Sequence, residues 1–161
     1  MIEMLVAGVT VDPMTKSPIV ILRDRESRRA LPIWIGALEA NAIVIVLEGV
    51  EMARPMTHDL LKAFLEKTGT SLRKVEITDI KENTYYALLH LERGNESFTM
   101  DSRPSDAIAL ALRCSVPIVV ASEVMKNALP IDDLDGAAEG KDRLTELLEK
   151  MDPEQFSKYK M

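Results

Sequence analysis

This 161-residue sequence contains one cysteine, few aromatic residues and no long hydrophobic run, and each of these absences excludes something. A single cysteine, Cys114, rules out an internal disulfide framework, and its Ala-rich surroundings favour a small buried thiol. Aromatic residues make up 4% of the chain against 47% for all hydrophobic residues, so the core must be aliphatic and rich in methionine. The longest apolar run, residues 42–47, is too short for a membrane span.

An excess of positive charge is also absent, since 26 Asp and Glu against 20 Lys and Arg give a formal net charge of −6 at pH 7. Residues 131–161 hold 5 Lys and Arg against 9 Asp and Glu, so much of the excess lies in the tail. The absence of a broad basic face argues against nonspecific binding to a nucleic acid duplex. Glu3 stands where a signal peptide would carry basic residues, which predicts a soluble cytoplasmic protein.

The hydrophobic periodicity predicts one α+β domain over residues 1–130. Strands are expected at 5–11, 18–22, 30–35, 72–78, 84–91, 97–101 and 117–121. Helices are expected at 37–49, 58–67 and 104–113, followed by a short one capped by Ser122. Thr57 is expected to cap the second helix and Gly69 to end it. The order β-β-β-α-α-β-β-β-α-β-α indicates a mixed, largely antiparallel sheet with packed helices.

The tail, residues 131–161, is predicted to be an extension of this domain rather than a second domain. An acidic linker is followed by apolar residues at helical spacing, Leu144, Leu147, Leu148 and Met151. We expect this amphipathic helix to pack on its own chain, although a neighbouring subunit is the alternative.

Two short motifs echo each other at the predicted helix starts. Residues 54–61 read Arg-Pro-Met-Thr-His-Asp-Leu-Leu, and residues 103–110 read Arg-Pro-Ser-Asp-Ala-Ile-Ala-Leu. Hydroxyl and Asp side chains can bind the free N–H groups of a helix start, and an arginine suits a phosphate or carboxylate. The motifs are therefore either two well-capped helices or the two halves of one anion-binding site.

Only two histidines are present, and they differ in context. His90 lies in an alternating strand pattern and is interpreted as an ordinary sheet residue. His58 begins a predicted helix, where the positive end of the dipole favours a neutral imidazole that can accept a proton or ligate a metal. Glu39 lies on an otherwise apolar helix stripe, so its carboxylate must be paired, bonded back to the helix start or used in chemistry.

These segments together resemble the bifunctional nuclease family, whose members are described as cutting both DNA and RNA. The matching pieces are residues 31–36 with Glu39 and Ala40, residues 54–60, residues 101–111, and Pro117 with Ile118. The resemblance covers roughly residues 1–130 and implies a nuclease with a nucleic acid substrate. No metal motif of strong spacing, Walker loop or GxGxxG motif is present.

The first functional hypothesis is a metal-assisted phosphodiesterase. Its catalytic residues are His58, Asp59, Asp101 and Asp106, with His58 as the base. Phosphate would be bound by Arg54, Arg103, Thr57 and Ser105. A Mg²⁺ or Mn²⁺ ion would be held by Glu39, Asp59, Asp101 and Asp106.

Two other hypotheses use the same residues. The chain could be a non-catalytic module that binds an anion or a partner at the helix N-termini, which the acidic balance and sparse aromatics favour. It could also be a structural subunit of a homo-oligomer whose arginines pair with its own acids. No membrane partner is expected under any of the three hypotheses.

Overall fold

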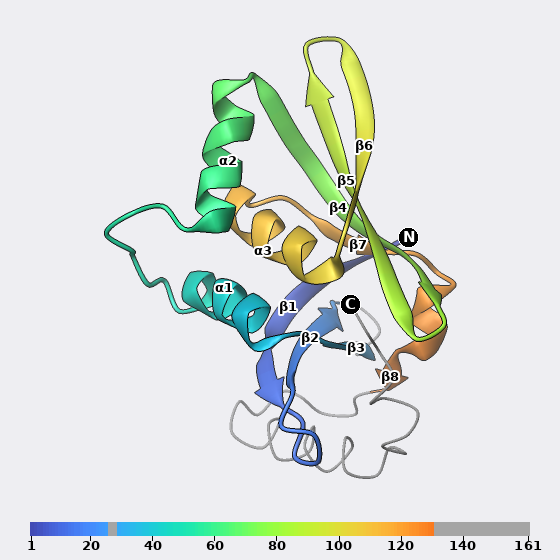
Figure 1. The fold of residues 1–161 in the computed structure, drawn as a ribbon. Helices are drawn as coiled ribbons and strands as arrows, with labels where there is room; N and C mark the ends of the chain where they lie inside the picture. The colour runs from blue at the N-terminus through green and yellow to red at the C-terminus, as the bar shows by residue number, and fades with distance from the viewer. Residues whose placement is uncertain (26–28, 131–161) are drawn as a thin grey trace.

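The computed structural model describes residues 1–25 and 29–130 (Figure 1). Along the chain the elements are β1 (Ile2–Val11), β2 (Pro18–Asp24), β3 (Arg29–Trp34), α1 (Ala37–Leu47), α2 (Thr57–Lys67), β4 (Thr70–Lys81), β5 (Thr84–Arg93), β6 (Glu96–Ser102), α3 (Pro104–Cys114), β7 (Ile118–Val120), a 3₁₀ helix (Val124–Asn127) and β8 (Leu129–Pro130). The predicted α+β class is confirmed. The short last helix is a 3₁₀ turn, and β8 was not predicted.

The strands form one eight-stranded sheet in the order β6-β5-β4-β7-β1-β2-β3-β8. Neighbouring strands are antiparallel except for β4 and β7, which are parallel. The three-residue strand β7 pairs with β1 on one side and β4 on the other. It therefore joins the first three strands and the second three strands into a single sheet.

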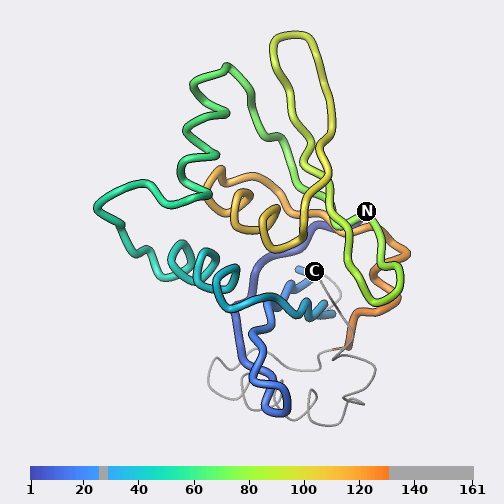
Figure 2. The backbone as a smooth tube through the Cα atoms, viewed as in Figure 1, coloured from blue at the N-terminus to red at the C-terminus, as the bar shows by residue number. Residues whose placement is uncertain are grey.

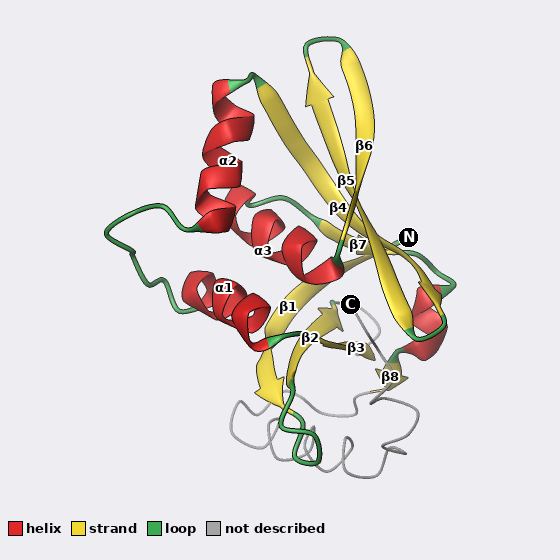
Figure 3. Ribbon diagram, in the orientation of Figure 1, coloured by secondary structure: helices red, strands yellow, loops and turns green. Residues whose placement is uncertain are grey.

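Helices α1, α2 and α3 lie together on one side of this sheet (Figure 3). Helix α3 packs against β4 and β5 and also contacts α1 and α2. Seven of its residues are buried, including Ala107, Ala109 and Ala111, whose small side chains allow neighbouring elements to approach closely. Helix α3 therefore contacts both other helices, and α1 and α2 also contact the sheet directly, α1 at β1 and β2 and α2 at β4.

The alternation along β5 distinguishes two faces of the sheet. Tyr85, Ala87, Leu89 and Leu91 are buried in the core, whereas the residues between them are more exposed. Successive side chains of a strand point to opposite faces. The first set lies on the helix-covered face, and the second set, which includes Leu88 and His90, lies on what we call the open sheet face.

Helix α2 starts one residue earlier than predicted. Met56 is its N-cap, and Thr57 is the first helical residue. The carboxylate of Asp59 accepts a hydrogen bond from the Met56 N–H at 2.9 Å, which satisfies a free donor of the helix start without the Thr57 hydroxyl. The prediction of a Thr57 cap was wrong for this reason.

Some predictions fall outside the described residues. The acidic linker and amphipathic helix of residues 131–161 do so, as does the centre of the turn between β2 and β3. Among the residues that are described, no helix combines the length and the hydrophobicity needed to cross a bilayer.

Candidate functional site

The two Arg-Pro motifs meet in the folded chain. His58, in the first turn of α2, and Asp106, in the first turn of α3, are 48 residues apart in sequence. Their Nε2 and Oδ1 atoms are 2.9 Å apart, and both side chains are partly shielded from solvent. The starts of two helices are thus joined through a histidine–carboxylate pair.

Arg103 extends this pair to a third helix. Its Nε donates a hydrogen bond to Oδ2 of Asp106 at 2.7 Å, and one terminal nitrogen donates to Oε1 of Glu39 at 2.9 Å. Glu39 lies in the first turn of α1. We call Glu39, His58, Arg103 and Asp106 the helix-start cluster, because each residue lies at or within one turn of the beginning of α1, α2 or α3.

Electrostatics favour the charged forms of Asp106 and Arg103. Burial raises the pKa of Asp106, but hydrogen bonds from Arg103 and His58 outweigh it and hold that pKa below its usual value. Hydrogen bonds to Asp106 and Glu39 raise the pKa of Arg103. Asp106 is therefore a carboxylate at neutral pH, and it accepts hydrogen bonds from both of its neighbours.

A second arginine, Arg113, attaches α2 to the far part of α3. Its Nε donates to Oδ1 of Asp59 at 2.7 Å, and a terminal nitrogen donates to the Ala109 carbonyl at 2.9 Å. The Arg113 side chain is only 5% exposed, whereas that of Asp59 is 37% exposed. Arg113 was not predicted as a site residue from the sequence, because the last turn of a helix is an ordinary place for a basic residue.

The other predicted phosphate-binding residues do not join the cluster. Arg54 is exposed and makes no hydrogen bond or ion pair with the part of the chain that the structure describes. Thr57 is exposed at the start of α2. Ser105 is 1% exposed, and its hydroxyl has no hydrogen-bonding partner among the described residues. A buried hydroxyl does not fit the role of a phosphate contact expected from the sequence.

Asp101 is also separated from the cluster. It lies directly opposite Leu88 in the pairing of β5 with β6, so the two side chains share the open sheet face. Arg103 pairs with Glu39 and Asp106 instead of Asp101. The structure therefore places the acidic residue before the second motif on the opposite side of the sheet from the helices.

The predicted metal ligands are not assembled into a preformed site. Over residues 1–25 and 29–130, no three His, Cys, Asp or Glu side chains are grouped closely enough to hold a metal ion. Glu39 and Asp106 are bonded to Arg103, and Asp59 is bonded to Arg113. A cation at the helix-start cluster would have to displace Arg103 from its carboxylates, so the arrangement as it stands fits an arginine-centred site.

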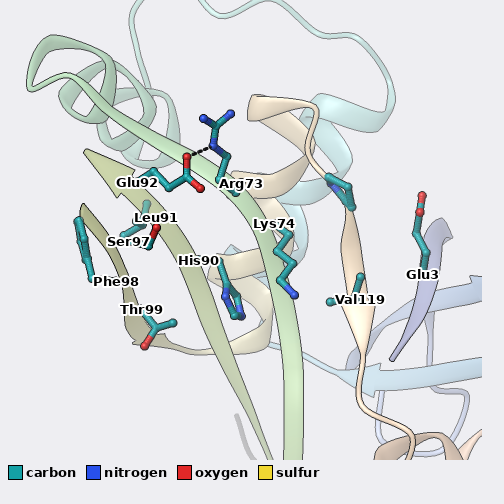
Figure 4. A pocket seen from close by; sticks show the side chains of 11 residues that line it. Glu3, Arg73, Lys74, His90, Leu91, Glu92, Ser97, Phe98, Thr99 and Val119 are labelled. Carbon is teal, nitrogen blue, oxygen red and sulfur yellow. Dashed lines mark hydrogen bonds and ion pairs between the residues drawn. The ribbon is translucent and has the colours of Figure 1, made fainter. Parts of the chain in front are cut away.

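A groove of about 570 Å³ lies on the open sheet face, between strands β6, β5, β4, β7 and β1 (Figure 4). His90 pairs with Glu76 at 2.7 Å at this groove, and Arg73 pairs with Glu92 at 2.6 Å. Among the lining residues Arg73 is paired with Glu92, and Lys74, whose Nζ lies 3.8 Å from Sδ of Met1, is left as a single cation without a carboxylate partner in the described residues, so the groove does not have the group of unpaired cations that a phosphate site requires. We therefore place the candidate site at the helix-start cluster.

The position of Glu39 depends on Gly36, the N-cap of α1. A Cβ atom at residue 36 would lie 2.1 Å from Oε2 of Glu39, so the Gly36→Ala variant must displace that carboxylate. The backbone φ of −77° is compatible with alanine. We expect Gly36→Ala to separate Glu39 from Arg103 while leaving every charge in place.

A crystal structure of the Gly36→Ala variant measures this displacement directly. The matched control is Glu39→Gln, which keeps the space but removes the charge. If the distance between Glu39 and Arg103 stays at 2.9 Å in the alanine variant, Gly36 has no part in positioning the carboxylate.

The fold and the cluster define a class of protein: a single mixed sheet whose three helices bring carboxylates, a histidine and an arginine together at their N-terminal ends. The model of the bifunctional nuclease domain family matches residues 20–131, which include all four residues of the cluster. The chain belongs to this family, which confirms the resemblance found in its sequence.

The curated relatives are of two kinds. An uncharacterized protein of Mycobacterium tuberculosis H37Rv is 38% identical over 162 residues, covering 96% of this chain and 97% of its own. Bifunctional nuclease 1 of Oryza sativa subsp. japonica is 34% identical over 112 residues, covering 68% of this chain and 34% of its own. Bifunctional nuclease 2 of Arabidopsis thaliana is 34% identical over 107 residues, 65% of this chain and 32% of its own. The chain thus spans about a third of the plant proteins.

Proposed function

We propose that this protein hydrolyses phosphodiester bonds of nucleic acids and that the helix-start cluster is its active site. The proposal is supported by family membership and by the names of the plant relatives, which are bifunctional nucleases. The observation that carries it is the continuous chain of hydrogen bonds from His58 through Asp106 to Arg103. A base, an orienting carboxylate and a phosphate-binding cation are the groups that this reaction uses.

His58 is the proposed general base. The ionised Asp106 can only accept at this contact, so an imidazole that acts as a base must donate Nε2–H to it, which fixes the tautomer. The lone pair then lies on Nδ1, which is the atom that would take a proton from an attacking water. Asp106 acts through His58 and Arg103 and is a positioning residue in this scheme.

Arg103 is the proposed phosphate-binding residue. A guanidinium carries five N–H donors, and the two hydrogen bonds to Asp106 and Glu39 leave three for a ligand. Its side chain is 47% exposed, so a phosphate can reach it from solvent. The two carboxylates hold the plane of the guanidinium in one orientation, which favours a bidentate contact with phosphoryl oxygens.

The substrate is proposed to be both DNA and RNA. A site that binds the phosphate through one arginine makes no contact that distinguishes the 2′-hydroxyl, which is the atom that identifies RNA. Because the chain is acidic overall and has no broad basic surface, we expect the nucleic acid to be bound only at this site.

The requirement for Mg²⁺ or Mn²⁺ stays a prediction. We expect cleavage of a short single-stranded oligonucleotide to stop in excess chelator and to return when Mn²⁺ is added. The measurement is gel analysis of fractions across the protein peak, so that activity is correlated with the amount of protein. Undiminished cleavage in excess chelator would mean that the arginine-centred mechanism does not use a metal. Activity that elutes apart from the protein would belong to a contaminant.

A non-catalytic anion-binding module is the alternative, and the lack of a grouped set of metal ligands within the described residues favours it. The pairing of Arg103 with Glu39 and Asp106 is what the structural-subunit hypothesis expects, whereas Arg54 has no such pair among the described residues. The two functions are separated by fluorescence anisotropy with a labelled oligonucleotide that is analysed for length afterwards. Binding that depends on Arg103, without any cleavage in the presence of Mn²⁺ or Mg²⁺, would support the module and reject the nuclease.

A further inference from the structure

Strand β6 ends the eight-stranded sheet, and the described residues leave its outer edge unpaired. Residues 96–101 of the strand are exposed, and Ser102 is half-buried. In Figure 2 the turn between β5 and β6 is the yellow-green tip that projects away from the rest of the chain. The other end of the sheet is β8, which has two residues and so offers little backbone for pairing. We call the outer side of β6 the β6 edge.

The turn before β6 shows which of its backbone groups are free. Arg93 pairs with Glu96, so the loop has two residues, and Gly94, with a φ of 60°, is the first. A two-residue loop with glycine first is a type II′ hairpin turn, whose closing residue pair exchanges hydrogen bonds. Hydrogen-bonded and non-hydrogen-bonded pairs then alternate along the strand. The residues whose N–H and C=O groups point to the β6 edge, without a partner among the described residues, are Ser97, Thr99 and Asp101.

The β6 edge lacks the features that usually protect an edge strand, which are lysine, proline, a β-bulge or a very short strand. The sequence of β6 contains no lysine and no proline over its seven residues. Its pairing with β5 is uninterrupted, whereas β1 and β4 each contain a register shift. The edge is therefore a regular template that another strand can extend.

Apolar side chains accompany these free backbone groups. Phe98 and Met100 lie opposite Leu91 and Leu89, so they extend the helix-covered face of the sheet out to the edge. No helix covers them there, since Phe98 is 37% exposed and Met100 is 51% exposed. A strand added at the β6 edge would satisfy the free backbone groups and cover these two side chains.

We propose that the β6 edge pairs in antiparallel fashion with the β6 edge of a second copy of this chain, so that one sheet continues through a twofold homodimer. The twofold axis passes through Thr99, the middle residue of the strand. This position pairs all of residues 96–102, whereas an axis at Phe98 or Met100 would pair only residues 96–100 or 98–102. The three outward-pointing residues then exchange six backbone hydrogen bonds, two for each residue pair.

The side chains of β6 suit this register. Phe98 lies opposite Met100 of the partner subunit, and the symmetry produces this apolar contact twice. Asp101 lies opposite Ser97 of the partner subunit, and Glu96 lies opposite Ser102 of the partner subunit, so no acid faces an acid. The two copies of Asp101 are offset by four residues along the strands, or about 13 Å. The edge is thus complementary to itself.

The chain's own tail is a poorer occupant of the β6 edge. Its apolar residues, Leu144, Leu147, Leu148 and Met151, have helical spacing, and a helix cannot offer the extended backbone that an edge strand pairs with. An extended segment of another protein has no reason to match the side-chain order of β6, whereas a second copy matches it along the whole strand. This inference does not depend on the proposed nuclease activity.

Sedimentation equilibrium of the full chain at micromolar concentration tests the proposal. We expect a mass twice the 18.0 kDa of one chain. Thr99→Pro should weaken self-association by roughly tenfold or more, because it removes an outward N–H and its ring obstructs the partner strand. The variant breaks no hydrogen bond to β5, since the Thr99 N–H points outward. Thr99→Val is the matched control, because it keeps that N–H and suits a strand, and it should sediment like the wild type.

A charge placed at Ser97 tests the register itself. Ser97→Lys puts a cation opposite Asp101 of the partner subunit and should tighten the dimer by roughly threefold or more, because the pair occurs twice. The same change in an Asp101→Asn background should give no such gain. Within one chain the two positions are about 13 Å apart and cannot pair. An equal gain in both backgrounds would contradict the proposed pairing.

The remaining outcomes also decide the question. A wild-type monomer at micromolar concentration overturns the proposal, and slow amide hydrogen exchange at Thr99 in that monomer would assign the β6 edge to the chain's own tail. A dimer that a folded Thr99→Pro variant leaves intact would place the interface elsewhere and equally overturn it. If Thr99→Pro does not fold, as Trp34 fluorescence reports, the comparison of the two Ser97→Lys backgrounds decides.

Discussion

Replacing Asp106 with asparagine is expected to lower the rate of phosphodiester cleavage more than tenfold, or more than about 1.4 kcal/mol of barrier. The substitution keeps the shape of the side chain but removes the charge that holds Arg103 and fixes the tautomer of His58. An amide that turns its NH₂ group toward His58 would favour the opposite tautomer and remove the base from Nδ1. Single-turnover cleavage of a labelled oligonucleotide measures the rate.

Asp101→Asn is the matched control for this experiment, because it makes the same chemical change on the open sheet face. Catalysis at the helix-start cluster predicts near wild-type cleavage in this variant, which departs from the catalytic role that the sequence suggested for Asp101. The fluorescence of Trp34, the one tryptophan of the chain, reports whether each variant is folded, since its indole is buried against Asp12. If Asp101→Asn abolishes cleavage and Asp106→Asn does not, the active site lies on the other face of the sheet.

Replacing Asp59 with alanine is expected to destabilise the fold by at least about 2 kcal/mol, the order of a lost helix cap together with an unsatisfied buried donor. The variant removes the acceptor for the Met56 N–H and leaves the buried guanidinium of Arg113 without its carboxylate. Because Asp59 is partly exposed, water can replace some of the lost hydrogen bonds, so the expected loss is smaller than that for breaking a fully buried ion pair. Urea denaturation followed by Trp34 fluorescence measures the free energy of unfolding.

The same variant should show a pH dependence of defined sign. The backbone hydrogen bond from Met56 and the hydrogen bond from Arg113 hold the pKa of Asp59 below its ordinary value of 3.8. A carboxyl whose pKa is lower in the folded state than in the unfolded state stabilises the fold at pH values above its unfolded pKa. This contribution is lost as the pH falls through its folded pKa. The difference between wild type and Asp59→Ala should therefore be largest near neutrality and should shrink below pH 3.8.

Lys62→Ala on the same helix is the control. Its pair with Glu66 is a surface contact at 3.8 Å, which is worth no more than about 0.5 kcal/mol. If Lys62→Ala and Asp59→Ala lower the free energy of unfolding equally, both substitutions act through the helix propensity of α2 and not through the pair of Asp59 with Arg113.

The sequence alone determined most of the elements and their order, since these depend on local signals, although the two-residue strand β8 was not predicted and the last helix is a 3₁₀ turn. Alternation marked β5, helical periodicity marked α3, and Gly and Pro marked most boundaries. The order of those elements indicated the α+β class, and the two Arg-Pro motifs indicated which helix starts carry polar groups. The start of α2 was misplaced by one residue because the Met56 N–H donates its hydrogen bond to the carboxylate of Asp59.

Only the tertiary structure decided which of these residues meet. Ser105 and Asp106 are neighbours in sequence, yet one is buried and the other joins His58, because adjacent residues point in directions about 100° apart around a helix. Asp101 was assigned to the site from its closeness to Arg103 in sequence, but strand register placed it on the open sheet face. Arg113 and Asp59 are 54 residues apart, and their contact follows from how α2 crosses α3. Local periodicity defines elements, whereas the direction in which each side chain points is fixed only when those elements pack.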